Sequence, residues 1–236
     1  MDNASRLAGR PSARLLAVSK LRPAAAIADL ASALRSFDRS RMGAATGGPG
    51  LVVAIGENYV QEARAKQAQL RDPALEWHLI GHLQSNKAQA AADLFDWIQT
   101  VDRPTLVAAL AKHRPAQRPP LNVLIQVNID DEASKHGCIP GDVPSLAAAI
   151  AAQSRLRLRG LMAIPAPSPD PLQRRDAFRR MWLLFEALLL TYPRTDTLSM
   201  GMSEDLELAI AEGATMVRVG SALFGRRDPA APDAAS

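Results

Sequence analysis

The chain has only one cysteine, Cys138, among its 236 residues, so it cannot form a disulfide within itself. Aromatic residues make up 4% of the sequence, which leaves few rings on which nucleic-acid bases could stack. The basic residues are scattered, and a net charge of +4 is too small to predict nucleic-acid binding. No stretch is apolar for long enough to cross a bilayer, and the first residues lack the apolar core of a secretion signal. These absences predict a cytoplasmic protein that binds neither nucleic acid nor membrane.

Short apolar segments recur along the chain and alternate with segments whose apolar residues have helical spacing. The hydrophobic content of 47% is enough for a large core. Strict alternation predicts a parallel sheet covered by helices, and eight such units in 236 residues predict a single (β/α)8 barrel. A doubly wound open sheet is the alternative. The predicted strands span 15–20, 51–55, 76–81, 97–101, 123–129, 158–164, 197–200 and 215–219.

The segments outside the strands also carry expectations. Residues 36–50 are rich in glycine and polar residues, so we expect a long loop there. A helix is expected over 204–211, with Ser203 as its N-cap. As domains we predict a short N-terminal arm (1–14), one barrel (15–226) and a disordered tail (227–236).

The first predicted strand ends in a lysine, Lys20, which is unusual for a buried strand. An ammonium group in an apolar place is costly unless it is paired, neutralised or used covalently. A desolvated lysine loses its proton readily, and the neutral amine can form a Schiff base with an aldehyde. On this segment alone, the simpler interpretation that Lys20 points into water is favoured.

Further candidates stand where the carboxyl ends of the strands would meet, the face that carries active sites in such barrels. Phosphate sites there often follow strands seven and eight, where Ser203 and the pair Gly220 and Ser221 stand. An aldehyde that carries a phosphate would suit both this end and Lys20. Arg218 is a permanent cation, and opposite a pyridine nitrogen it would keep that nitrogen unprotonated and weaken the ring as an electron sink. The candidate cofactor-binding residues are Lys20, Asn58, His78, Met200, Ser203, Arg218, Gly220 and Ser221.

Six segments in order resemble the pyridoxal phosphate homeostasis protein family: 17–20, 56–62, 77–87, 159–162, 199–205 and 217–221. The resemblance implies a fold-type III barrel related to the N-terminal domain of alanine racemase, with pyridoxal 5'-phosphate (PLP) as cofactor. It implies a Schiff base on Lys20, phosphate contacts from Ser203, Gly220 and Ser221, and Arg218 at the ring nitrogen. Members of that family bind and buffer PLP without established turnover. We therefore expect no catalytic residue, PLP-dependent apo-enzymes as partners, and a monomer or weak dimer.

The sequence departs from the family pattern in the segment 36–54, which has no good counterpart, and at His82, where the family generally has proline. The alternative function is a PLP-dependent amino-acid racemase, which needs a second acid or base opposite Lys20. In alanine racemases a tyrosine from a separate domain fills that role. This chain has only Tyr59 and Tyr192. Tyr59 is near the expected site but belongs to a motif of the non-enzymatic family, and Tyr192 precedes the seventh strand, at the wrong end, so binding is favoured over catalysis.

Two further features are a pair of histidines that could bind a metal and a pair of lysines in loops. His78 and His82 are four apart, but on a strand and turn that spacing does not define one face. Since no cysteine or carboxylate cluster completes a ligand set, no metal site is expected. Lys87 and Lys135 lie in loops near the predicted active face, where solvated charge is the favoured interpretation.

Overall fold

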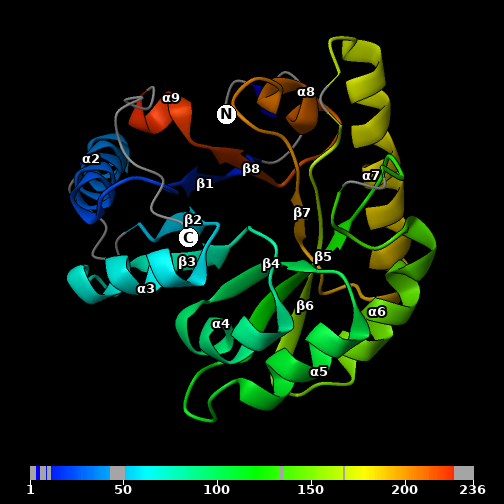
Figure 1. Ribbon diagram of the computed structural model, residues 1–236. Helices are drawn as coiled ribbons and strands as arrows, with labels where there is room; N and C mark the ends of the chain where they lie inside the picture. Colours follow the sequence, from blue (N-terminus) through cyan, green and yellow to red (C-terminus); the bar gives the residue numbers. More distant parts are fainter. Residues whose placement is uncertain are drawn as a thin grey trace.

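The structure is a computed structural model that describes residues 12–42, 51–132, 135–166 and 168–225, together with residues 4, 5 and 9. Its centre is a closed barrel in which strands β1 to β8 follow one another in chain order (Figure 1). Every neighbouring pair is parallel, and β8 pairs with β1. The predicted (β/α)8 barrel is confirmed, and closure of the sheet excludes the open doubly wound alternative.

The strands lie close to where the apolar segments predict them, with ends that shift by a few residues. The first strand ends at Val18 rather than at Lys20, so the lysine stands in the turn that follows. The strands are β1 Arg14–Val18, β2 Val53–Glu57, β3 Leu75–Leu79, β4 Trp97–Val101, β5 Leu121–Val127, β6 Leu156–Ala163, β7 Thr197–Ser199 and β8 Met216–Val219.

Helices connect the strands and form the outer layer of the barrel (Figure 1). The long helix α7 buries Phe178, Met181 and Phe185 against the sheet, at helical spacing. Among the described residues, no helix combines the length and apolarity needed to cross a bilayer. The helices are α2 Ala24–Met42, α3 Val60–Gln69, α4 Ala88–Leu94, α5 Pro104–His113, α6 Val143–Ala151, α7 Pro171–Thr191, α8 Leu206–Ala211 and α9 Ser221–Phe224; short 3-10 turns cover Ser85–Lys87 and Pro140–Asp142.

Two local predictions are wrong. Residues 36–42 continue helix α2 instead of forming a loop; residues 43–50 lie outside the described part of the chain. The helix continues because no glycine or proline occurs between Pro23 and Met42, and Arg35 anchors it by donating 2.6 Å to Asp72 Oδ2. Helix α8 begins at Leu206, so Ser203 lies in the preceding turn and is not the N-cap. The expected arm and tail fall largely on residues outside the described ranges.

The core has an apolar outer part and a mixed inner part. Between sheet and helices, one large cluster of buried aliphatic and aromatic side chains fills the space. Inside the barrel there are two small apolar clusters, one of which contains Leu16 and Met216 and the other Trp97 and Met162. Buried polar side chains fill the rest of the interior, including His78, which is fully buried. This polar interior forms the floor beneath the active face.

Candidate functional site

A cavity of about 840 Å³ opens at the carboxyl ends of the strands. Its size falls within the roughly 300–1,000 Å³ that is typical of small-molecule sites. Two of the eight predicted site residues, His78 and Met200, are fully buried and do not line it. The other six do line it: Lys20, Asn58, Ser203, Arg218, Gly220 and Ser221. Tertiary structure therefore brings together residues from both ends of the chain at this cavity.

Lys20 lies in a tight turn directly after β1. The turn begins where the Ser19 N–H donates a 3.0 Å hydrogen bond to the Gly56 carbonyl, which continues the pairing of β1 with β2. Leu21 has a φ of 60°, a left-handed conformation that non-glycine residues adopt only at a cost of about 1–2 kcal/mol. Its N–H donates 2.5 Å to Glu62 Oε1, which helps to hold that conformation. The backbone on both sides of Lys20 is therefore fixed.

A buried lysine, Lys66, supports this turn from α3. Its ammonium donates three 2.7 Å hydrogen bonds, to the Ser19 carbonyl, to Glu57 Oε1 and to Glu62 Oε1. These bonds satisfy all three of its N–H groups, so Lys66 is committed to the turn. Burial raises the pKa of the Glu57 carboxyl, although the hydrogen bonds from Lys66 and Ser19 oppose that rise. Sequence reasoning missed this group; its signal was a pair of charged residues, Glu57 and Lys66, at positions expected to be buried.

Arg218 on β8 projects into the floor of the cavity and is only 3% exposed. Its Nη1 donates 2.9 Å hydrogen bonds to both the carbonyl oxygen and the hydroxyl of Ser199, and Nη2 donates 2.9 Å to the Ala163 carbonyl. Burial lowers the pKa of Arg218 to about 10, with the charge of Asp205 in opposition. Arg218 therefore remains a cation at neutral pH. These bonds use three of its five N–H groups.

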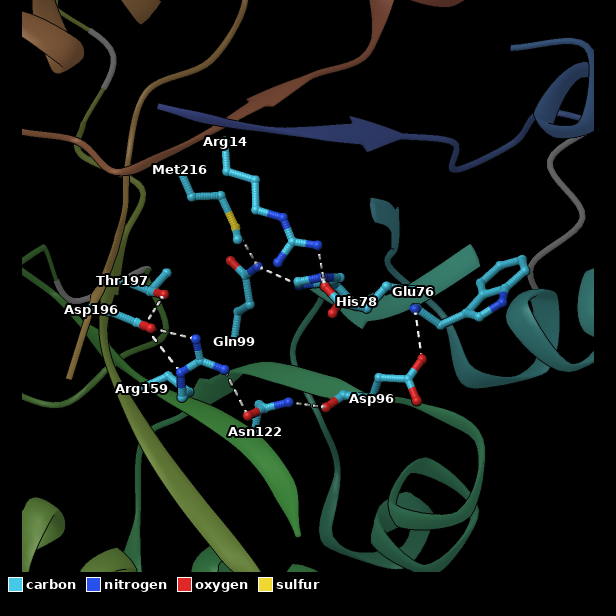
Figure 2. Close-up of polar contacts among 11 residues, drawn as sticks. Arg14, Glu76, His78, Asp96, Gln99, Asn122, Arg159, Asp196, Thr197 and Met216 are labelled. Atoms are coloured by element: carbon cyan, nitrogen blue, oxygen red, sulfur yellow. Dashed lines mark hydrogen bonds and ion pairs between the residues drawn. The ribbon is translucent and has the colours of Figure 1, made fainter. Parts of the chain in front are cut away.

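A hydrogen-bonded chain runs from Ser199 through Gln99 to His78 in the barrel interior. Figure 2 shows its lower part, from Gln99 through His78 to Glu76. The Ser199 hydroxyl donates 2.7 Å to Gln99 Oε1, and Gln99 Nε2 donates 2.9 Å to His78 Nδ1. His78 Nε2 then lies 2.6 Å from Glu76 Oε1, which also accepts a 2.7 Å bond from Arg14. This order of donors requires a neutral His78 with its proton on Nε2. Burial lowers the pKa of His78, in agreement with the neutral form.

His78 thus acts from below the cavity, because it is joined to Arg218 through two intervening side chains, Gln99 and Ser199. Its ring also stacks on Trp97, with centroids 5.0 Å apart. Met200 is likewise a packing residue, fully buried in the large apolar cluster. The sequence placed both residues near the correct end of the barrel but could not say that their side chains lie beneath the surface.

Glycines allow the loops around the cavity to approach closely. A Cβ on Gly81 would lie 2.2 Å from the carbonyl oxygen of Asn58, so only glycine lets the loops after β2 and β3 meet there. Gly201 has a φ of 88°, and a Cβ on it would lie 2.4 Å from that of Ala209. These contacts fix Asn58 on one side of the cavity and the turn that carries Ser203 on the other.

Three further basic residues line the cavity: Arg22, Arg174 and Lys135, the last of which was expected near this face. Arg22 donates to the Gly225 carbonyl, and Lys135 lies 3.1 Å from Glu132 Oε2. Arg174 Nε is buried and has no hydrogen-bond partner. With Lys20 and Arg218 the lining has five basic residues against two acidic ones, which favours an anionic ligand. Nothing in the sequence distinguishes Arg22 and Arg174 from ordinary surface charge.

Comparison with known proteins agrees with this geometry. A family model described as alanine racemase, N-terminal domain, matches residues 2–228. Alanine racemase from Corynebacterium glutamicum is 19% identical, with a TM-score of 0.60 over 97% of this chain and 59% of that one, which shows a common fold. The fold and the cavity therefore define a barrel of the alanine racemase N-terminal class.

Relatives with higher sequence identity show which family within this class the chain belongs to. A pyridoxal phosphate homeostasis protein of Pseudomonas aeruginosa is 50% identical over 232 residues, 97% of this chain and 92% of the relative. The Escherichia coli K12 protein of the same name is 49% identical over 218 residues, 91% of this chain and 86% of the relative. The structure of PipY from Synechococcus elongatus with PLP bound is 37% identical, with a TM-score of 0.75 over 94% of this chain and 99% of PipY. The chain belongs to the pyridoxal phosphate homeostasis protein family.

Proposed function

We propose that this protein binds pyridoxal 5'-phosphate at Lys20 and acts in PLP homeostasis, holding the cofactor without turning over a substrate. One observation carries the proposal: a lysine, a buried arginine and two serines line one cavity in which basic residues outnumber acidic ones by five to two. When bound, PLP supplies a phosphate and an aldehyde, and the aldehyde condenses with a primary amine with loss of water. The donor set of the cavity fits both groups, since Lys20 offers the amine and the basic lining favours the phosphate.

Each lining residue has a proposed role in this binding. The fixed turn after β1 presents the Lys20 amine to the cavity. Ser203, Gly220 and Ser221 would hold the phosphate from the turns after β7 and β8. Arg218 would face the ring nitrogen, and a cation there keeps that nitrogen unprotonated and disfavours carbanion chemistry. Asn58 borders the cavity, His78 supports it from the barrel interior, and Met200 packs in the apolar cluster between sheet and helices.

The absence of catalysis is part of the proposal. Racemisation by two bases needs an acid or base on the side opposite Lys20. Among the described residues that line the cavity there is no tyrosine, and Tyr59 is 49% exposed at the rim. Tyr192 follows α7, away from the cavity. An assay for D-alanine formed from L-alanine in the presence of PLP should therefore show no turnover, and activity that depends on Lys20 would favour the racemase alternative.

Borohydride reduction tests the binding site directly, because it makes a Schiff base permanent. The protein is incubated with PLP, reduced and mapped by peptide mass analysis, and its five lysines allow an unambiguous assignment. We expect one adduct, at Lys20, which is lost in Lys20→Ala. Lys135→Ala is the matched control, since Lys135 also lines the cavity and its loss should leave the adduct in place. An adduct on Lys135, or adducts spread over several lysines, would contradict the proposal.

The proposed recipients of the cofactor are PLP-dependent apo-enzymes. Loaded protein, freed of excess PLP, is mixed with an apo-transaminase, and the recovered transaminase activity is followed over time. Transfer is supported if transaminase activity recovers faster with the loaded protein than with protein whose Schiff base was reduced. Equal rates of recovery would contradict transfer. Light scattering on the eluting protein tests the expectation of a monomer or weak dimer.

A further inference from the structure

A second group of polar side chains lies at the carboxyl end of the barrel, beside the cavity but outside it. It consists of His82 after β3, Asp102 after β4 and His136 in the loop after β5. Each residue offers one ligand atom, and these atoms lie within 4.8 Å of one another. None of the three lines the cavity, so this group is separate from the proposed PLP site.

The ligand atoms of the three side chains lie near enough to one another for one ion to be shared after the side chains rotate. His82 Nδ1 lies 3.9 Å from Asp102 Oδ2. The rings of His82 and His136 stack with centroids 3.7 Å apart and planes 13° apart, so their in-plane lone pairs run side by side and the rings must tilt apart before both nitrogens point at one ion. In a tetrahedral zinc site with bonds of 2.0–2.1 Å, two ligand atoms lie about 3.4 Å apart. Both imidazoles are exposed, so their side chains can rotate to bring the set to that spacing and direction.

Neighbouring groups hold the first two of these residues in place. Arg103 Nη1 donates 2.6 Å to Asp102 Oδ1, which leaves Oδ2 directed toward His82. Arg103 Nη2 donates 2.8 Å to the carbonyl of Leu83, the residue after His82. The residue before it, Gly81, is fixed in the same way, since its carbonyl accepts a 2.9 Å bond from the Thr100 hydroxyl. One arginine therefore orients the carboxylate and secures the backbone of the first histidine.

The third residue is anchored to β5. The carbonyl of His136 accepts a 3.1 Å hydrogen bond from Gln126 Nε2. Two residues further on, the Cys138 N–H donates 2.9 Å to the Gln126 carbonyl, and Cys138 forms a parallel bridge with Val127. The loop thus returns onto the strand and carries His136 back beside His82.

We propose that His82, Asp102 and His136 form a binding site for a divalent transition-metal ion such as Zn²⁺. Two imidazoles and one carboxylate suit such ions, whereas Mg²⁺ and Ca²⁺ prefer sets made of oxygen atoms. Three protein ligands leave a fourth position for water or an incoming group. Sequence analysis considered His78 as the companion of His82, but His78 turns into the barrel interior.

The test is metal titration of the untagged, full-length protein after treatment with a chelator. Zn²⁺ affinity is measured by competition with a chromogenic chelator, and Co²⁺ is added to report the coordination geometry from its visible absorption. We expect one equivalent of Zn²⁺ and a weakening of more than about tenfold in both His82→Gln and His136→Gln. His113→Gln is the matched control, because His113 ends α5 and is not in the group, and it should bind like the wild type.

A second measurement separates loss of the site from loss of the fold. Zn²⁺ should raise the Tm of the wild type and of His113→Gln, while the two ligand variants should melt as the metal-free wild type does, with or without Zn²⁺. Comparison of Cys138→Ala with the wild type shows whether the single thiol contributes to Zn²⁺ binding. Absence of Zn²⁺ binding, binding that survives both histidine substitutions, or binding that disappears in Cys138→Ala would overturn the proposal.

Discussion

The Lys66 ammonium donates a 2.7 Å hydrogen bond to the carbonyl oxygen of Ser19, the residue directly before Lys20. The same ammonium holds Glu57 at the end of β2 and Glu62 on α3, both at 2.7 Å. The turn that presents the proposed PLP-binding lysine is therefore fixed by a second lysine that is itself buried and fully hydrogen-bonded. This arrangement separates the two lysines by role, since one is free to react and the other is committed to structure.

Replacing Lys66 by methionine should lower both stability and the reactivity of Lys20. The change leaves the Glu57 carboxylate buried without its cation, and breaking a buried pair in this way typically costs about 3–5 kcal/mol. Urea unfolding measures the loss, and the rate of adduct formation at Lys20 reports the loosened turn. Adding Glu57→Gln to Lys66→Met should recover part of the stability, because the unpaired charge is then gone. The exposed Lys112→Met is the control, and a loss as large there as at Lys66 would contradict this role.

Arg218→Lys should weaken PLP binding while the barrel stays folded. A lysine cannot bridge the Ser199 and Ala163 carbonyls and also reach into the cavity, because it lacks the planar fork of the guanidinium. Loss of one charged hydrogen bond to the ligand, about 1.5–3 kcal/mol, predicts an affinity lower by about tenfold or more. Titration with PLP followed by absorbance measures it. Arg157→Lys, on an exposed position, should leave the titration unchanged; an equally unchanged Arg218→Lys would remove Arg218 from the site.

Gly81→Ala should disturb the cavity through Asn58. The new methyl group would stand 2.2 Å from the Asn58 carbonyl oxygen, so one of the two loops must move. Overpacking of this kind costs about 1–3 kcal/mol, and the displaced Asn58 should lower the affinity for PLP as well. Gly141→Ala makes the same chemical change where a Cβ would have nothing within 4 Å, so it should be neutral or slightly stabilising. Equal effects at the two positions would show that the close approach at Gly81 is unimportant.

Glu76 should make stability depend on pH in the acid range. Burial alone would raise the pKa of its carboxyl, but the hydrogen bond from His78 and the charge of Arg14 outweigh burial and hold that pKa at about 2, against 4.5 when unfolded. The stabilisation is therefore complete above pH 4.5 and is lost as the pH falls toward 2.

Urea unfolding of wild type and Glu76→Gln at several pH values measures this contribution. The difference in unfolding free energy should be largest at pH 7 and should shrink as the pH falls below 4.5. The exposed Glu186→Gln serves as the control and should change stability by less than about 0.5 kcal/mol. A difference between wild type and Glu76→Gln that stays constant down to pH 3 would contradict the prediction.

Much of the molecule follows from local sequence patterns. The spacing of the apolar residues, and the polar, glycine and proline residues that separate the apolar segments, predict the strands and the closed barrel. They do so because each strand must bury both faces and each helix one. The loop predicted over 36–42 was wrong because the polar residues on the exposed face of a helix resemble the composition of a loop. The ion pair that anchors this helix joins Arg35 to Asp72, 37 positions away in the sequence. Ser203 was misplaced for a related reason, since the turn before α8 is closed instead by Asp205, which accepts a 2.7 Å hydrogen bond from the Met202 N–H.

The sequence by itself determined the alternation of strand and helix and the face on which polar residues gather, because strand ends and helix starts are local features of the chain. The roles of Lys20 and Arg218 remain predictions. Only the tertiary structure decided which side chains share a space. It placed His78 beneath the cavity, assigned Lys66 to the Lys20 turn and brought His136 beside His82, 54 positions away. These outcomes depend on how far each side chain reaches across a closed barrel, and that distance is set by packing between strands that are remote in the sequence.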